Sequence, residues 1–418
     1  MSKIISPFII LSILLWTEIG SYLAMRAFFV DSKTKLKRFN WIWWIATLGL
    51  YGLFFGSRLI DSNYTRNVLV NAYFMLMIPK LIISLVFGIA SIIKGIKLIS
   101  TKKRAPHFPE ATQIGRRNFT SKLALGVAAI PLGTMMYGIF KTAYDFKIHR
   151  PRIKFKNLPK AFDGFKIVQL SDIHTGSLQN EHQLQKAIDL VMEEKPDMIV
   201  ITGDLVNNRT DEAFPFIPIL SQLSAPYGVF SVLGNHDYGD YEKWNSEAEK
   251  VKNMDQMYEL HKTIGWNLLL NEAVSIEKNG DKIALLGVEN WGKSKYFPKY
   301  GKLDETLKGT EDFDFKILLS HDPSHYDAEV MNLRPDIDLT LAGHTHGFQF
   351  GIEIPGYVKW SPSKYIYPKW AGLYSNGDQH LYVNRGLGCL GYMGRVGVRP
   401  EITSIVLASA SAPLSLRF

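Results

Sequence analysis

The pattern of apolar and polar positions divides the chain into two unlike parts. Long apolar stretches dominate the first 140 residues, whereas later apolar runs are short and are separated by polar segments. Four early stretches are long enough to cross a bilayer, whose hydrocarbon core requires about 20 apolar residues. They lie near residues 4–30, 41–60, 72–93 and 123–140. The pattern predicts a transmembrane region of about four helices within residues 1–140. Buried helices of a soluble domain are the alternative.

One charged residue conflicts with the third stretch. Lys80 follows Pro79 within it, and a lysine inside the bilayer is costly unless it pairs or reaches the interface. We therefore expect this span to begin nearer Met75.

Basic residues indicate an orientation. They follow the first stretch and the third, at Lys33, Lys35, Lys37, Arg38, Lys94, Lys97, Lys102, Lys103, Arg104, Arg116, Arg117 and Lys122. Positively charged loops remain in the cytoplasm. This predicts a multi-pass protein of the cell (inner) membrane whose C-terminal part is extracytoplasmic. Further basic residues between Lys141 and Lys156 count against this orientation. The net charge of +9 fits these topology signals, and we expect no nucleic-acid partner.

The remainder of the chain has an α/β pattern. Residues 141–160 are basic and contain prolines, which predicts a linker, and residues 161–418 are expected to form one domain. Within Ser177–Glu194, Leu184, Ile188 and Val191 recur at helical spacing, which predicts a crossover helix. The single cysteine excludes an intramolecular disulfide.

Five apolar, β-rich runs in this domain each end in polar residues. The runs are Phe165–Leu170, Met198–Thr202, Val229–Leu233, Ile317–Ser320 and Leu339–Ala342. The motifs that follow are Asp172-x-His174, Gly203-Asp204, Gly234-Asn235-His236-Asp237, His321 and Gly343-His344-x-His346. In an open α/β sheet, ligands bind outside the carboxyl ends of the strands. The motifs therefore predict one site with enough oxygen and nitrogen donors for two metal ions that share a carboxylate, as in phosphoryl transfer.

These motifs, in this order, resemble those of the calcineurin-like metallophosphoesterases. The resemblance covers the chain from about Leu158 onward, and the closing stretches Leu381–Gly388 and Arg399–Ile402 resemble a bacterial membrane-associated subgroup. It implies an α/β fold, a four-layer α/β/β/α sandwich, here preceded by the N-terminal multi-helix transmembrane region.

The resemblance also implies a ligand set. Asp172, His174 and His346 would bind one metal, Asp204 would bridge both, and Asn235, His321 and His344 would complete the second. Mixed nitrogen and oxygen donors suit Mn, Fe, Zn or Co, so the expected cofactors are two divalent metal ions of undetermined identity. His325 lies close to His321 in the chain, but His321 directly follows the apolar run.

The resemblance places His236 near the phosphate, where it would stabilise the transition state or protonate the leaving oxygen. Asp237 would orient His236, and the nucleophile would be a metal-bound hydroxide. A structural histidine is the alternative for His236. Arg385 could bind a substrate phosphate or form a structural ion pair. His325 could contact substrate or lie elsewhere on the surface.

Aromatic residues alternate with lysines between Tyr357 and Tyr374. This composition suits the headgroup layer of a membrane, although a packed loop that covers the sheet edge would also explain it. Phe348 occupies a position where a second glycine is common in the family, so the substrate should not be transferred from relatives.

The sequence thus predicts a membrane-anchored enzyme that hydrolyses a phosphomonoester, phosphodiester or pyrophosphate, on a phosphate-ester substrate that could be lipid-linked. The alternatives are a UDP-diacylglucosamine-type pyrophosphatase, a protein phosphatase and a non-catalytic membrane ligand sensor. The oligomeric state is left open.

Overall fold

The computed structural model describes residues 7–60, 63–100, 110–178, 181–354 and 356–410. The chain divides into two compact units, residues 1–137 and residues 138–418. We describe each unit separately.

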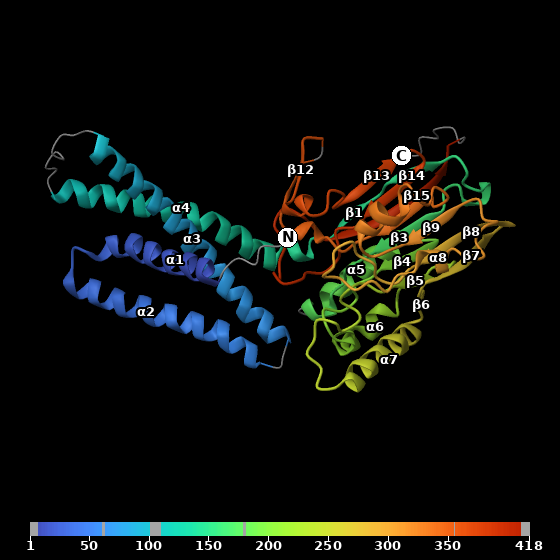
Figure 1. Ribbon diagram of the computed structural model, residues 1–418, viewed down its shortest axis with the longest axis horizontal. Helices are drawn as coiled ribbons and strands as arrows, with labels where there is room; N and C mark the ends of the chain where they lie inside the picture. Colours follow the sequence, from blue (N-terminus) through green and yellow to red (C-terminus); the bar gives the residue numbers. More distant parts are fainter. Residues whose placement is uncertain (1–6, 61–62, 101–109, 179–180, 355, 411–418) are drawn as a thin grey trace. The chain divides into compact units, whose positions relative to one another are not determined.

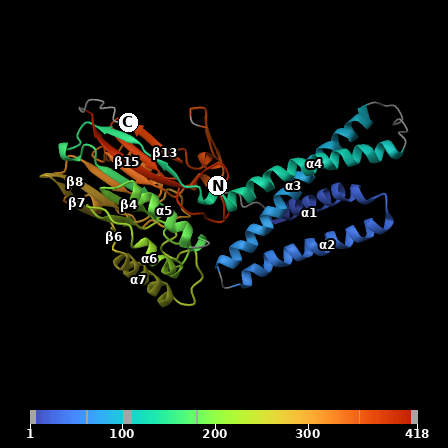
Figure 2. The same ribbon diagram turned by 180° about the vertical axis from the view of Figure 1, so that it is seen from behind.

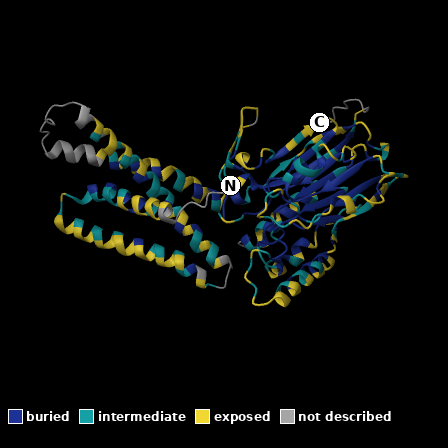
Figure 3. Cartoon of the chain, viewed as in Figure 1, coloured by how far each residue is buried: buried dark blue, intermediate teal, exposed yellow. Residues whose placement is uncertain are grey.

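Four long helices form the described part of the N-terminal unit. They are α1 (Pro7–Arg26), α2 (Lys33–Gly56), α3 (Asn63–Ser100) and α4 (Glu110–Phe140), which ends in the second unit. Among the described residues, the segments Thr65–Ile93 and Phe119–Tyr144 are long and apolar enough to cross a membrane. Figure 3 shows exposed positions along these helices, many of which are large apolar side chains such as Ile42, Leu48 and Ile89.

The helices extend beyond the apolar stretches that predicted them. The basic residues from Lys33 to Arg38, expected in a loop, lie in the first turns of α2. Lysine and arginine are good helix formers, so a helix can continue past its apolar segment. Lys102, Lys103 and Arg104 lie outside the described residues.

Lys80 is paired inside the helical unit. Its Nζ lies 2.9 Å from Glu18 Oε2 on α1 and 3.2 Å from Thr47 Oγ1 on α2. The apolar segment that contains Lys80 starts at Thr65, and α3 continues through Pro79; the start of the span near Met75 stays a prediction. The ion pair, which the sequence alone did not reveal, offsets the cost of burying the lysine.

The second unit contains two main sheets (Figure 1). The first has the order β1 (Lys147–His149), β15 (Glu401–Ser409), β3 (Lys166–Leu170), β4 (Met198–Thr202), β5 (Val229–Val232) and β6 (Asn267–Leu268), with β2 (Arg152–Phe155) also paired to β15. The second has the order β13 (Gly372–Asn376), β14 (Gln379–Val383), β10 (Leu339–Ala342), β9 (Lys316–Leu319), β8 (Asp281–Gly287) and β7 (Glu272–Lys278). The five apolar runs of the sequence are therefore strands β3, β4, β5, β9 and β10, and β3–β4–β5 and β9–β10 are parallel.

Alternating side chains build the layers. Ile167 and Val200 of the first sheet pack with Ile317 and Leu341 of the second. The opposite face of the first sheet is covered by α5 (Glu181–Glu193), α6 (Ile217–Leu220) and α7 (Glu247–Ile264), as both Figure 1 and Figure 2 show. The outer layer of the second sheet is thinner and consists of α8 (Leu303–Thr306), α9 (Pro323–His325) and the π-helical turn Tyr326–Val330. The predicted α/β/β/α arrangement is confirmed, and α5 is the predicted crossover helix.

Part of the predicted linker, residues 147–149 and 152–155, belongs to the first sheet. Strands β1 and β2 both pair in parallel with β15. In β2, Ile153 and Phe155 are buried while Arg152 and Lys154 are exposed. Buried and exposed residues alternate along β2, as in a half-buried strand. In the sequence, however, its exposed basic residues suggested a linker.

Candidate metal centre

The loops that follow five strands bring all seven predicted ligands together. Five of these residues, Asp172, His174, Asp204, His344 and His346, have positive φ angles between 48° and 70°. This region is unfavourable for residues other than glycine, and such strain collects at functional sites because the surrounding fold enforces it. The backbone therefore turns sharply after β3, β4 and β10 to direct these side chains inward.

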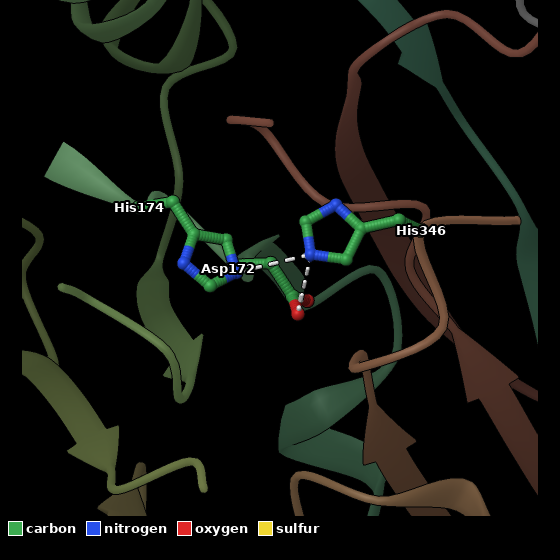
Figure 4. Close-up of side chains that lie close together, drawn as sticks. All are labelled: Asp172, His174 and His346. Carbon is green, nitrogen blue, oxygen red and sulfur yellow. Dashed lines mark hydrogen bonds and ion pairs between the residues drawn. The ribbon is translucent and has the colours of Figure 1, made fainter. Parts of the chain in front are cut away.

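The first cluster contains Asp172, His174 and His346 (Figure 4). The Nε2 atoms of the two histidines are 3.1 Å apart, and His346 Nε2 lies 3.2 Å from Asp172 Oδ1. His174 Nδ1 lies 3.2 Å from the Val206 carbonyl oxygen, to which it donates a hydrogen bond. This bond leaves the Nε2 lone pair facing the cluster.

The second cluster is centred on Nε2 of His321. This atom lies 3.1 Å from Asp204 Oδ2, 3.2 Å from His344 Nδ1 and 3.2 Å from Asn235 Oδ1. His321 Nδ1 donates to the Thr202 carbonyl oxygen at 2.7 Å, so Nε2 is the ring nitrogen that faces the other ligands.

Asp204 lies between the two clusters. Its Oδ2 is 3.1 Å from His321 Nε2 and 3.6 Å from His174 Nε2. Its Oδ1 accepts the backbone N–H of His236 at 2.8 Å. One carboxylate therefore contacts ligands of both clusters, which is the geometry of a bridging residue.

The electrostatics of the site suit cations. Burial lowers the pKa of His174 to about 3 and also lowers the pKa of His344. Neutral imidazole is the form that binds metals. Burial opposes ionisation of Asp204, but the adjacent histidines hold its pKa well below the ordinary value. Burial disfavours the charged form of His321, but the Asp204 and Asp172 carboxylates raise its pKa to about 10, so His321 would release its Nε2 proton when a metal binds. Buried carboxylates and imidazoles whose ring nitrogens converge fit two divalent metal ions.

Several residues that orient the ligands were missed in the sequence. The hydroxyl oxygen of Tyr241 accepts a hydrogen bond from Asn235 Nδ2 at 3.0 Å, which turns Asn235 Oδ1 toward His321. The hydroxyl of Tyr367 lies 2.8 Å from His344 Nε2, and Asp322 Oδ2 lies 3.7 Å from the same nitrogen. Tyr367 belongs to the aromatic–lysine segment, whose unusual composition was the available signal.

His236 lies at the edge of the centre and is partly exposed. Its ring is 5.2 Å from that of His174, and its Nδ1 lies 2.6 Å from the Asn207 carbonyl oxygen. Asp237 does not contact it as predicted. The Asp237 carboxylate instead accepts backbone N–H groups of Asp204, Leu205, Val206 and Gly234. The turn folds Asp237 beneath the Asp204 loop, so the residue that orients His236 is Asn207.

The two predicted substrate-binding residues are both buried. Arg385 donates to Glu353 Oε1 at 2.7 Å and also to Glu401, which is the structural ion pair that the sequence left as an alternative. His325 stacks on Trp291, with ring centroids 4.8 Å apart, and contacts Ser320 at 2.8 Å and Glu329 at 3.1 Å. A surface position for His325 is excluded, because the residue is fully buried.

Comparison with known proteins agrees with this geometry. Residues 165–348 match the family described as calcineurin-like phosphoesterase. Residues 1–143 match the family described as probable calcineurin-like phosphoesterase, transmembrane domain.

Two relatives match more than two thirds of the chain. The uncharacterized metallophosphoesterase YkuE of Bacillus subtilis is 32% identical over 304 residues, which are 72% of this chain and 99% of that protein. A transmembrane protein with metallophosphoesterase domain from Danio rerio is 31% identical over 297 residues, which are 69% of this chain and 62% of that protein. The resemblance therefore extends beyond bacteria. The chain belongs to the calcineurin-like metallophosphoesterases, which are metal-dependent hydrolases of phosphoric esters.

Proposed function

We propose that this chain is a membrane-anchored phosphoesterase that uses two divalent metal ions to hydrolyse a phosphomonoester, phosphodiester or pyrophosphate bond. The position of Asp204 carries this proposal. Its Oδ2 lies 3.1 Å from His321 Nε2 in one cluster and 3.6 Å from His174 Nε2 in the other. Two cations in such a site need a shared anion to limit their repulsion.

The ligands would divide as their clusters do. Asp172, His174 and His346 would hold one ion, and Asn235, His321 and His344 the other. When bound, the two cations would polarise the phosphoryl oxygens and lower the pKa of a water molecule. The buried ligands hold their geometry without rearrangement, because their other polar atoms are already bonded to backbone carbonyls and to Tyr241 and Tyr367.

His236 would supply the proton for the leaving oxygen. Its Nδ1 is occupied by the Asn207 carbonyl, so its Nε2 is the ring atom that can carry and release this proton. Partial exposure at the edge of the centre leaves room for a substrate beside it. General acid catalysis requires such a group within hydrogen-bonding reach of the leaving oxygen.

We propose a multi-pass location in the cell membrane, with the N-terminus and the catalytic unit outside the cytoplasm. The match to a transmembrane-domain family and the two apolar segments support membrane anchoring. The basic residues near the start of α2 support the orientation. An outward-facing, anchored enzyme favours a lipid-linked phosphate ester, and a cytoplasmic domain would favour a nucleotide-linked lipid.

The test is metal content together with turnover for Asp204→Asn in the full chain. We expect the wild-type protein in detergent to bind two equivalents of Mn, Fe, Zn or Co and to hydrolyse members of a panel of phosphate esters and lipid pyrophosphates. Asp204→Asn should bind fewer ions and lose orders of magnitude in rate. Asp378→Asn, a change at an exposed aspartate that pairs with Lys156, is the matched control and should retain both. Unchanged stoichiometry and rate in Asp204→Asn would contradict the two-metal assignment.

A further inference from the structure

A small hairpin of the catalytic unit exposes an unusual number of apolar side chains. Strands β11 (Ile352–Ile354) and β12 (Val358–Trp360) form an antiparallel pair that stands out from the unit (Figure 1). Exposed apolar residues continue into the segment that follows. We call the whole set the hairpin surface, and it consists of Ile352, Ile354, Tyr357, Val358, Tyr365 and Ile366.

The two faces of the hairpin are opposite in character. Ile352 pairs with Trp360 and Ile354 pairs with Val358, so these four side chains share one face. Glu353 and Lys359 pair on the other face.

The polar face is the one bonded to the catalytic unit. Glu353 accepts hydrogen bonds from Arg385, and Lys359 donates to the Ala371 carbonyl oxygen. The apolar face is consequently turned outward, the reverse of an ordinary surface hairpin. Ile352 is 52% exposed and Ile354 is 51% exposed, while Tyr357 at the turn is 88% exposed. Contiguous exposed apolar surface of this kind marks an interaction site.

The base of the hairpin is attached to the loop that receives the end of α4. Gly351 N–H donates to the Val396 carbonyl oxygen at 2.9 Å, and Val396 N–H donates to the Gln349 carbonyl oxygen at 2.7 Å. One residue earlier in that loop, Arg395 N–H donates to the Gly138 carbonyl oxygen at 3.2 Å. Gly138 lies in the apolar segment Phe119–Tyr144, which is long enough to cross a membrane. The hairpin thus starts where this segment enters the catalytic unit.

We propose that the hairpin surface inserts into the interfacial layer of the same bilayer that holds α4. Tyrosine and tryptophan favour this layer, and aliphatic side chains gain free energy by leaving water. Tyr365 joins the hairpin through a contact of 3.4 Å between its hydroxyl and Trp360 Nε1. Lys364 is exposed, and its Nζ lies 5.3 Å from the Tyr365 ring, so this surface also presents a cation to anionic lipid headgroups.

The same segment connects the hairpin surface to the metal centre. Ile366 is 65% exposed, and the next residue, Tyr367, places its hydroxyl 2.8 Å from His344 Nε2. A molecule anchored in lipid beside Ile366 therefore has a short path to the metal ligands. This inference about the substrate rests on the proposed function, and it favours substrates with a lipid tail over soluble phosphate esters.

The depth of Tyr357 tests the membrane contact directly. Tyr357→Cys in the full chain is labelled with an environment-sensitive NBD fluorophore and reconstituted at one chain per nanodisc containing phosphatidylglycerol. The label should emit at shorter wavelength, be quenched by doxyl-labelled lipids and be protected from aqueous iodide. Ser275→Cys is the matched control, because Ser275 is exposed on β7, at the opposite edge of its sheet from β13. Its label should respond to iodide only. The protein without an introduced cysteine, treated with the same fluorophore, measures how much label attaches to the buried Cys389.

Two results would overturn the proposal. Quenching of the Tyr357 label by iodide, to the level of the Ser275 control, would place the hairpin surface in water. Protection from both quenchers would show that protein covers it, either a second copy or another part of this chain. The readout needs no turnover, so an absence of phosphoesterase activity would refute the proposed function and leave this measurement valid.

Discussion

His236 and Asp237 are neighbours in the chain but have separate partners and separate tasks. Asp237 fixes the Asp204 loop through three of its backbone N–H groups, and it accepts a fourth from Gly234 in its own turn. Its replacement should therefore disturb the bridging carboxylate first. His236 contributes its backbone N–H to Asp204 and its ring to the open edge of the site. Its side chain can be removed without removing a metal ligand.

We expect His236→Ala to retain both metal ions and lose about 10²–10⁴-fold in rate, the usual contribution of general acid–base catalysis. The loss should shrink on nitrophenyl esters, whose leaving groups need no proton. Metal analysis and rates on good and poor leaving groups test this, with the exposed His182→Ala as control. Equal losses on both substrates would indicate phosphate binding or a structural role, and loss of a metal ion would mean that the ligand set is misassigned.

At the residue level, sequence reasoning succeeded where a side chain follows directly from its strand. All seven predicted ligands converge, since each lies within a few residues of a carboxyl end of a parallel strand. It failed for Tyr367, Asn207 and Asp237, whose contacts depend on how separate loops fold over one another. Arg385 shows the same limit, because its partner Glu353 belongs to a hairpin that the sequence did not predict.

The elements around the site were predictable to different degrees. Apolar runs and a helix with a clear 3.6-residue period identified β3, β4, β5 and α5. The sequence pattern did not predict short strands with one charged face, such as β1 and β2. Helix α7 has a weaker pattern, because it carries a buried histidine among its core contacts. His261 packs near Trp266, and its ring nitrogens contact the Met257 carbonyl oxygen at 2.9 Å and Ser231 Oγ at 3.2 Å.

Burial lowers the pKa of His261 from 6.5 to about 4. A lowered pKa in the folded state means that the unfolded chain binds the proton more readily, so this residue destabilises the fold as pH falls from 6.5 toward 4. At about 1.4 kcal/mol for each unit of pKa shift, the lowered pKa of His261 corresponds to about 3 kcal/mol of folding free energy. Thermal unfolding of the full chain in detergent should show a large drop between pH 7 and pH 4, and His261→Gln should reduce it. An equal drop in His261→Gln, or the same reduction in the exposed His182→Gln, would contradict this assignment.

For the whole molecule, the sequence identified two units because their apolar patterns differ, and strands β1 and β2 lie within the residues that it assigned to a linker. Some of the basic residues after α4 lie in strands of the catalytic unit. Lys147 lies in β1, and Arg150 pairs with Glu194.

Orientation can be measured with reporters fused after Phe146, just beyond the segment Phe119–Tyr144. Because the basic residues of 32–40 and 94–122 are expected in the cytoplasm, alkaline phosphatase, which needs an oxidising compartment for its disulfides, should be active there. Green fluorescent protein exported in unfolded form should be dark. Fusions after Ser32 should give the opposite pattern and serve as the control. Fluorescence after Phe146 without phosphatase activity would place the catalytic unit in the cytoplasm. That result would shift the expected substrate to a nucleotide-linked lipid. The proposals for the metal centre and for the contact between the hairpin surface and the bilayer would stand, since a cytoplasmic leaflet presents the same interfacial layer.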